Sequence, residues 1–371
     1  RIRALRGLIL AGLALPGRER ALQTGLDFLQ GETARQVHPD GGHYSRSPAV
    51  QARVLADFVG LRETLLAAGR EVPEWLQGAV DRMVPMLRAL RHGDGGLALF
   101  NGAGEGDAGA LDQLLARVAV CGKPMASGPH TGFHRLAAGR TVIVADTGPP
   151  ADARANPRAH AGTLSFEMSV GKERLVVNCG PGQDGGWRAA LSATAAHSTC
   201  VVDDTNSSEI DAAGGFRRTP SSVTGNRRQI DGAIVLEASH DGYKATFGLT
   251  HRRRVMLAAD GESVTGEDNL IGSHEGAFCL RFHLHPSVQA SLLEEGRSVL
   301  IRLPRGGGWR FTADEGRVSL EESVYFPSRE TRKKSLQMVV SGGLEGAGAT
   351  VKWQFGRIDP GPGQKGSTDQ K

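Results

Sequence analysis

The chain has 371 residues, with 44 lysines and arginines against 40 aspartates and glutamates, and 39% of its residues are hydrophobic. A chain of this length can form two domains with separate cores. Its net charge of only +4 argues against the concentrated basic surface of a nucleic-acid-binding protein. Glycine, at 51 residues, predicts many tight turns and therefore a large β portion, and it forms no collagen-like repeat.

The first 120 residues have the pattern of a helical domain. Apolar residues recur at helical spacing, which leaves one polar face of each helix for solvent. The predicted helices cover residues 20–30, 48–68, 74–91 and 112–120. The apolar run 7–15 is interpreted as a further helix ending at Pro16, because no clear cleavage site of a secretory leader follows it. No apolar run reaches the roughly 18–20 residues that a membrane span needs.

Beyond a boundary between about Leu111 and Thr141, short β-branched or alternating runs are separated by Gly, Asp and Asn turns. Since no helices alternate with these runs, we expect an antiparallel β-sandwich over residues 121–358 rather than a parallel sheet. The tail, residues 359–371, has no apolar content and is predicted to be disordered. The predicted strands are 141–146, 164–170, 174–178, 198–202, 233–238, 244–250, 252–257, 263–269, 278–285, 299–303, 309–312, 317–324, 336–341 and 349–355.

One loop of the helical half has the composition of a binding site. The segment HPDGGHYSRSP precedes the predicted helix at Pro48 and brings His43, Tyr44 and Arg46 together among glycines and prolines. Such a loop is poor core material but suits a site on a helical scaffold. The structural alternative is an N-terminal cap, with Ser47 as the capping residue and Pro48 in the first helical turn.

Other polar candidates lie in a second loop and near the ends of predicted strands. The loop FNGAGEG lacks the Gly-Lys-Ser/Thr ending of a phosphate-binding loop, so a nucleotide site is not expected there. The polar residues of this loop are expected near the domain junction. Two single histidines precede predicted strands, and a His–Tyr pair lies in a predicted hairpin turn. All of these side chains can face a shared groove. These candidates are Asn101, Glu105, His160, His197, His240 and Tyr243.

A metal site has weaker support. His283 and His285 are two residues apart in a predicted strand and therefore share a face, which can bind a metal or can be simply hydrogen-bonded. No third ligand is evident, and the four cysteines contain no CxxC pair. No cofactor is assigned, and a structural divalent metal is left open. One functional hypothesis is therefore a metal-dependent hydrolase that uses these two histidines, and it ranks below the two that are given next.

The order of these motifs resembles that of heparinase II/III-like proteins, which are relatives of polysaccharide lyases. The segments AHAGTLSFEMS and AHSTCVVDDTNSSEI are its most specific parts, and the resemblance extends from about Arg20 to Phe355. It implies a multidomain α+β fold in which the last helices of an incomplete (α/α) toroid precede an antiparallel β-sandwich. A groove between the two would hold the sugar chain, and the resemblance implies a location in the periplasm or cell envelope.

The resemblance implies β-elimination on an acidic, uronate-containing polysaccharide. That reaction needs a neutralised carboxylate, a base for the C5 proton and an acid for the leaving oxygen. Tyr44 is the candidate base, with His43 and Arg46 beside it to favour the ionised phenol, and His197 is expected to approach across the groove. The candidate substrate ligands are Arg46, Asn101, Glu105, His160, His240 and Tyr243. A non-catalytic carbohydrate-binding protein of the same fold is the alternative.

Overall fold

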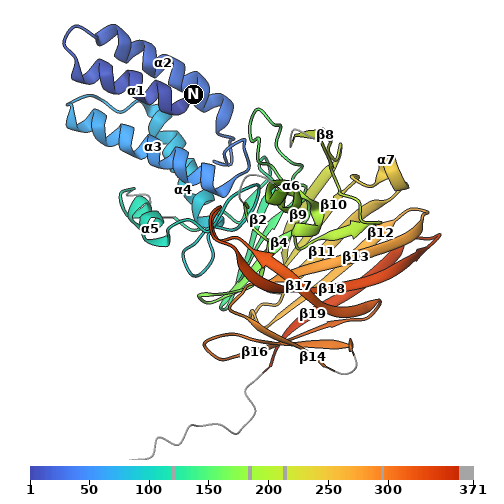
Figure 1. Ribbon diagram of the computed structural model, residues 1–371. Coiled ribbons are helices and arrows are strands. Elements are labelled where there is room, and N and C mark those ends of the chain that lie inside the picture. Colours follow the sequence, from blue (N-terminus) through green and yellow to red (C-terminus); the bar gives the residue numbers. More distant parts are fainter. Residues whose placement is uncertain (119–121, 183–185, 212–214, 294–295, 359–371) are drawn as a thin grey trace, which may run out of the picture.

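The computed structural model describes the chain except for residues 119–121, 183–185, 212–214, 294–295 and 359–371, so the predicted disordered tail lies outside the described residues. Helices form the N-terminal part and lie beyond one end of two large antiparallel sheets (Figure 1). Within the described ranges, no helix is long and apolar enough to cross a membrane. The predicted α+β order, with helices before an antiparallel sandwich, is confirmed.

The N-terminal helices share one apolar core that includes Leu29, Phe58 and Val80, all fully buried. Gly12 lets the first two helices pack closely, because a Cβ there would lie 2.5 Å from the backbone nitrogen of Leu22. The third helix begins at a proline, which has no amide hydrogen to leave unsatisfied. The helices are α1 (Ile2–Ala14), α2 (Glu19–Gln36), α3 (Pro48–Ala67), α4 (Glu74–Ala89) and α5 (Ala108–Ala116).

The strands form two large sheets and one small one, and all their pairings are antiparallel. The first sheet has the order β1-β2-β3-β4-β5-β13-β18-β17, and β6 also pairs with β13. Its strands are β1 (Ser127–Gly128), β2 (Phe133–Ala138), β3 (Thr141–Asp146), β4 (Phe166–Val170), β5 (Glu173–Val177), β6 (Cys200–Val202), β13 (Glu275–Leu284), β17 (Arg317–Tyr325) and β18 (Lys333–Glu345).

The second sheet has the order β14-β15-β16-β19-β12-β11-β10-β9. Its strands are β9 (Val223–Ile230), β10 (Ala233–His240), β11 (Thr250–Leu257), β12 (Ser263–Ile271), β14 (Gln289–Leu293), β15 (Ser298–Arg302), β16 (Gly308–Ala313) and β19 (Ala349–Ile358). The small sheet pairs β7 (Glu209–Ile210) with β8 (Phe216–Arg218), and the remaining short helices are α6 (Gly186–Ser192), the 3₁₀ turn η1 (Thr194–Ala196) and α7 (Lys244–Phe247).

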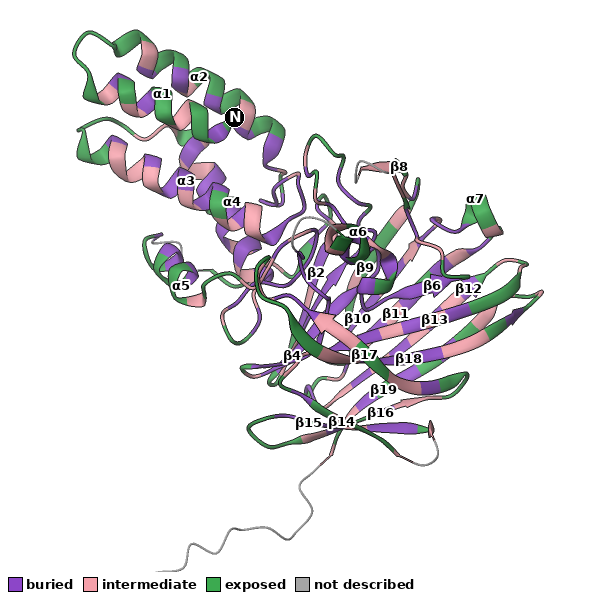
Figure 2. Cartoon of the chain, viewed as in Figure 1, coloured by how far each residue is buried: buried purple, intermediate pink, exposed green. Residues whose placement is uncertain are grey.

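Alternation along β13 shows how the sandwich core forms. Leu280 and Phe282 point into the core, and His283 points to the opposite face of the sheet. The ring centroid of Phe282 lies 5.1 Å from those of both Phe311 and Trp353 in the second sheet. Figure 2 shows buried residues along the strands of both sheets. Each such aromatic contributes about 1.5–3 kcal/mol through burial.

Several elements differ from the sequence predictions, and strands β2 and β14 and helix α6 were not predicted at all. The strand predicted over 244–250 is wrong in its first half, where α7 ends at Gly248, whose φ is +70°. The last predicted helix, 112–120, begins earlier as α5, because the carboxylate of Asp107 accepts hydrogen bonds from the Gly109 and Ala110 amides at 2.9 and 3.1 Å. Strand β9 was not predicted, since an exposed edge strand of sequence VTGNRRQI lacks hydrophobic alternation.

An apolar seam joins the helical part to the sandwich. Met86 and Leu90, at the end of α4, pack with Phe100 of the following loop against Phe133 and Val144 of β2 and β3. The rings of Phe100 and Phe133 are 5.5 Å apart. This seam brings the two polar loops of the helical part beside the first sheet, where their side chains meet those of the sandwich.

Candidate functional site

Arg46, predicted as a substrate ligand, instead joins the helical part to the sandwich. Its guanidinium forms an ion pair with Asp146 at the end of β3 and donates to the Thr131 carbonyl at 2.8 Å. Both charged side chains are buried, and Arg46 has a φ of +54°. A buried charge requires its partner, so this arginine holds the loop in place and is not available to a ligand. The prediction for Arg46 is therefore corrected.

Asn101 belongs to the same polar junction. Its amide nitrogen donates to the Arg46 carbonyl at 3.1 Å and to Asp146 at 3.2 Å, while its amide oxygen accepts from the backbone nitrogen of His160 at 3.2 Å. Asn156 donates to the Asn101 carbonyl at 3.0 Å. Asn101 is 3% exposed and both ends of its amide are used. It borders the neighbouring cavity, but its role there is to shape the wall.

A cavity of about 420 Å³ opens beside this junction, next to α3 and the loops around Tyr44 and Asn101. Tyr44 lines it and is half-buried, and no described residue forms a hydrogen bond with its hydroxyl group. The phenol ring stands edge-on to the His43 ring, with centroids 4.9 Å apart. The charged residues of the lining are five arginines and one aspartate, namely Arg1, Arg3, Arg53, Arg158, Arg329 and Asp57.

His43 lies in the inner wall of this cavity and is held on both sides of its ring. Nδ1 lies 2.7 Å from the Ser45 hydroxyl, and Nε2 lies 3.2 Å from the Gln36 side-chain oxygen. Burial, reinforced by the charge of Arg53, lowers the pKa of His43 to about 3. The imidazole is therefore neutral at pH 7. The prediction that His43 and Arg46 supply positive charge to Tyr44 is corrected, because the arginines of the lining carry that charge.

His160 and His197 form a buried pair behind Asn101, away from the cavity lining. Nδ1 of His197 donates to the Ala193 carbonyl at 2.8 Å, so its Nε2 accepts from Nδ1 of His160 at 3.0 Å. Burial lowers the pKa of His197 to about 4 and that of His160 well below its usual value. The expected approach of His197 across the groove is thus corrected, since both of its ring nitrogens are used inside the sandwich domain.

Glu105 forms a second link between the two parts. Its carboxylate accepts a hydrogen bond from Tyr325 at the end of β17 and lies 3.7 Å from His285. Its backbone nitrogen donates to the Pro327 carbonyl at 2.9 Å. Burial alone would raise the pKa of Glu105, but His285, followed by Arg174 and Tyr325, holds it down at about 2. Glu105 is therefore an anchoring carboxylate outside the cavity lining, which corrects its prediction as a substrate ligand.

His240 and Tyr243 do not reach the cavity, because both are buried inside the sandwich. Nε2 of His240 lies 3.2 Å from His251, whose other nitrogen lies 2.6 Å from Asp268. The hydroxyl of Tyr243 donates to the Cys200 carbonyl at 2.8 Å. With exposures of 1% and 0%, neither predicted ligand can contact a glycan. Their predicted role is corrected to a structural one.

The proposed metal pair is not arranged for a metal. His283 is buried, with Nδ1 2.8 Å from the Ser323 hydroxyl and Nε2 3.0 Å from the Ala195 carbonyl. His285 lies just after β13, and its Nδ1 is 2.7 Å from the Ser287 hydroxyl. Across the described part of the chain, no group of three or more His, Cys, Asp and Glu side chains could hold a metal ion. The metal-dependent hydrolase hypothesis loses its site.

The arginines of the cavity were missed by the sequence analysis. Arg53 lies on α3, Arg158 in a loop of the sandwich domain, and Arg329 in the turn between β17 and β18. Arginine is common in this chain, so composition does not single out these three. The only local signal is that Arg158 comes directly before the segment AHAGTLSFEMS.

The geometry can now be compared with known proteins. The chain is 31% identical over 375 residues to FtsZ-localized protein C of Caulobacter vibrioides (strain NA1000 / CB15N), and this match covers 96% of the chain and 64% of that protein. The chain therefore spans less than two thirds of the length of this curated relative.

Solved structures show the same fold at low sequence identity. Heparan sulfate lyase HepC from Pedobacter heparinus matches with a TM-score of 0.79 and 18% identity, over 98% of this chain and 60% of that one. A heparinase III matches with a TM-score of 0.78 and 14% identity, over 96% and 60% of the two chains. Residues 121–354 match the family model for the heparinase II/III-like C-terminal region. The chain belongs to the heparinase II/III-like family.

Proposed function

We propose that this protein binds an acidic, uronate-containing glycan in the cavity at Tyr44 and cleaves it by β-elimination. The single observation that carries the proposal is a phenol hydroxyl without a protein partner in the described residues, in a cavity whose charged lining residues are five arginines and one aspartate. The heparinase-like fold supports the choice of a glycan as the substrate class.

The charge of the lining suits a polyanion. Arg53 of this lining is exposed, and the one carboxylate of the lining, Asp57, already lies 3.4 Å from Arg3 and 3.0 Å from Arg6. Arginine binds carboxylates in a bidentate manner and stays protonated throughout the physiological range. A uronate held by Arg53 would have its carboxylate neutralised, which acidifies the neighbouring C5 proton.

Within this proposal, Tyr44 acts as the acid–base group. Its phenolate removes the C5 proton, a double bond forms between C4 and C5 as the bond between C4 and the leaving oxygen breaks, and the phenol gives the proton to that oxygen. His43 positions Tyr44 through the edge-on ring contact and remains neutral. His160 and His197 support the wall through Asn101 and do not touch the substrate.

The test is a lyase assay on the full-length protein. Wild-type protein is incubated with heparan sulfate and with alginate, and the ultraviolet absorbance of the unsaturated product is followed. Tyr44→Phe should lower turnover by about 100-fold or more while leaving the fold intact. Tyr243→Phe is the matched control, because that buried hydroxyl donates to the Cys200 carbonyl inside the sandwich, away from the cavity. Full activity of Tyr44→Phe would refute Tyr44 as the base.

A second candidate function comes from the sequence relative. The 31% identity over 96% of the chain favours a protein that localises with FtsZ, as the name of that relative indicates for itself. If the protein is instead a lyase, we expect it in the periplasm or cell envelope. A fluorescent fusion of the full-length protein separates the two. Coincidence with FtsZ, together with no product from either glycan, would favour the second candidate.

A further inference from the structure

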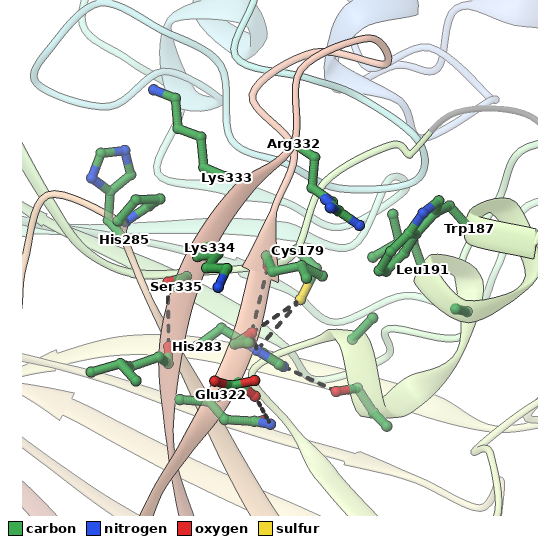
Figure 3. A pocket seen from close by; sticks show the side chains of 18 of the residues that line it. Cys179, Trp187, Leu191, His283, His285, Glu322, Arg332, Lys333, Lys334 and Ser335 are labelled. Atoms are coloured by element: carbon green, nitrogen blue, oxygen red, sulfur yellow. Dashed lines mark hydrogen bonds between the residues drawn. The ribbon is translucent and has the colours of Figure 1, made fainter.

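A second cavity, of about 690 Å³, lies against the outer face of the first sheet (Figure 3). Its inner surface is formed by Cys179 after β5, His283 of β13 and Ser323 of β17. Trp187 and Leu191 of α6 form one wall. Apolar side chains dominate the lining, and His283 and His285, the histidine pair noted in the sequence, also border this cavity.

The polar groups at the bottom of this cavity are bound to each other and unsuited to catalysis. The thiol of Cys179 lies 3.4 Å from Nδ1 of His283, which also contacts the hydroxyl of Ser323. Burial raises the pKa of Cys179 to about 12 and lowers that of His283 to about 3. Neither group changes its charge near neutral pH, so the cavity is suited to binding rather than to chemistry.

The rim of the cavity is basic. Arg332, Lys333 and Lys334 follow one another at the start of β18, are exposed and line the opening. The Arg332 guanidinium lies 5.4 Å from the centre of the Trp187 ring. Within the described residues neither lysine has a carboxylate partner, and Glu322 is the one acidic residue of the lining. An anionic ligand with an apolar ring face therefore fits this cavity better than a neutral or cationic one.

The two cavities share the turn between β17 and β18 as a common wall. Arg329 of this turn lines the Tyr44 cavity, and Arg332 lines the second one. Arg329 and Arg332 are thus three positions apart in the same turn, with Glu330 and Thr331 between them. The two cavities are also connected at α6. Trp187 of this helix lines the second cavity, and its neighbour Arg188 donates at 2.7 Å to the carbonyl of Pro157, which lines the first cavity.

We infer that the second cavity binds the continuation of the acidic glycan, so that a long chain crosses the β17–β18 turn and places further anionic sugars against Trp187 and the lysines. This inference rests on the proposed binding of an acidic glycan at Tyr44. Sugar rings present apolar faces to an indole, and their carboxylates or sulfates meet the lysines at the rim. The consequence is that affinity depends on the length of the glycan.

Calorimetric titration of the full-length protein with a tetrasaccharide and an octasaccharide of heparan sulfate tests the inference. To prevent cleavage, Tyr44→Phe serves as the parent. The octasaccharide should bind about tenfold more tightly than the tetrasaccharide, as expected of a few exposed ion pairs. Lys333→Glu/Lys334→Glu should remove that gain and leave the tetrasaccharide affinity unchanged, since the tetrasaccharide occupies only the first cavity.

The control is Lys244→Glu/Lys352→Glu, which changes the net charge equally at exposed positions outside both cavities. It should keep the length-dependent gain. An equal gain in the parent and in Lys333→Glu/Lys334→Glu, or no gain in the parent, would overturn the second binding site alone. Failure of both saccharides to bind the parent would overturn the proposed function together with the inference.

Discussion

The domain junction and the cavity beside it contain the same kinds of side chain in opposite environments. At the junction, Arg46, Asp146 and Asn101 are buried and bonded to one another. In the cavity, Arg53 is exposed and the Tyr44 hydroxyl has no described partner. The comparison shows that the type of a residue in a loop is not enough to tell whether its side chain binds a ligand or supports the structure. Burial and partners make that distinction.

The largest expected effect comes from breaking the junction. Arg46→Met leaves the Asp146 carboxylate buried without its partner and should lower the free energy of unfolding by about 3–5 kcal/mol. Arg53→Met, at an exposed position of the cavity, should change it by less than about 0.5 kcal/mol. Urea denaturation at pH 7 measures both.

A double variant sharpens this result. Arg46→Met/Asp146→Leu removes both charges and should recover part of the lost stability, because no unpaired carboxylate remains. If Arg46→Met and Arg53→Met are equally stable, the two regions do not differ as described.

The next effect is the response of the buried His160–His197 pair to acid. The pKa of His197 is lowered by burial to about 4 in the folded protein, below its usual value of 6.5. As the pH falls, His197 therefore becomes protonated in the unfolded chain before it does so in the folded protein. Its contribution to the free energy of unfolding is complete above about pH 6.5 and decreases as the pH drops toward 4, by up to about 1.4 kcal/mol per pH unit. His197→Gln should show a shallower loss between pH 6.5 and 4.5 by denaturation. Parallel curves would contradict it.

The fold was largely predictable because its pattern is local. Helical spacing of Leu and Val marked α3 and α4, a β-branched run marked β3, and alternation marked β13. The failures have physical causes. α7 is a single turn that ends at Gly248 with a positive φ, and β9 gains its stability from backbone pairing at an edge rather than from an apolar face.

The site was predictable only in part. The loop with His43 and Tyr44 does border a cavity, as its composition suggested. The partners of each side chain could not be read from the sequence, because Arg46 meets Asp146 and Glu105 meets Tyr325 across long separations in the chain. His160 and His197 do contact each other, yet inside the sandwich domain rather than on the cavity wall.

The smallest effect separates binding from stability in the cavity. Arg53→Gln should weaken binding of a heparan sulfate tetrasaccharide about fivefold, as expected from the loss of one exposed ion pair, and leave the urea midpoint unchanged. Arg252→Gln, on the far strand β11, is the matched control and should change neither quantity. Equal affinities of Arg53→Gln and wild type would remove this arginine from the glycan site.

Hydrogen–deuterium exchange of full-length Tyr44→Phe, with and without heparan sulfate tetrasaccharide, tests the central claim most directly. The account predicts slower exchange in peptides that cover residues 36–54 and 155–158, which line the cavity from the helical part and from the sandwich domain. Protection confined to other peptides, or none at a saturating concentration, would contradict the claim that this cavity is the glycan site.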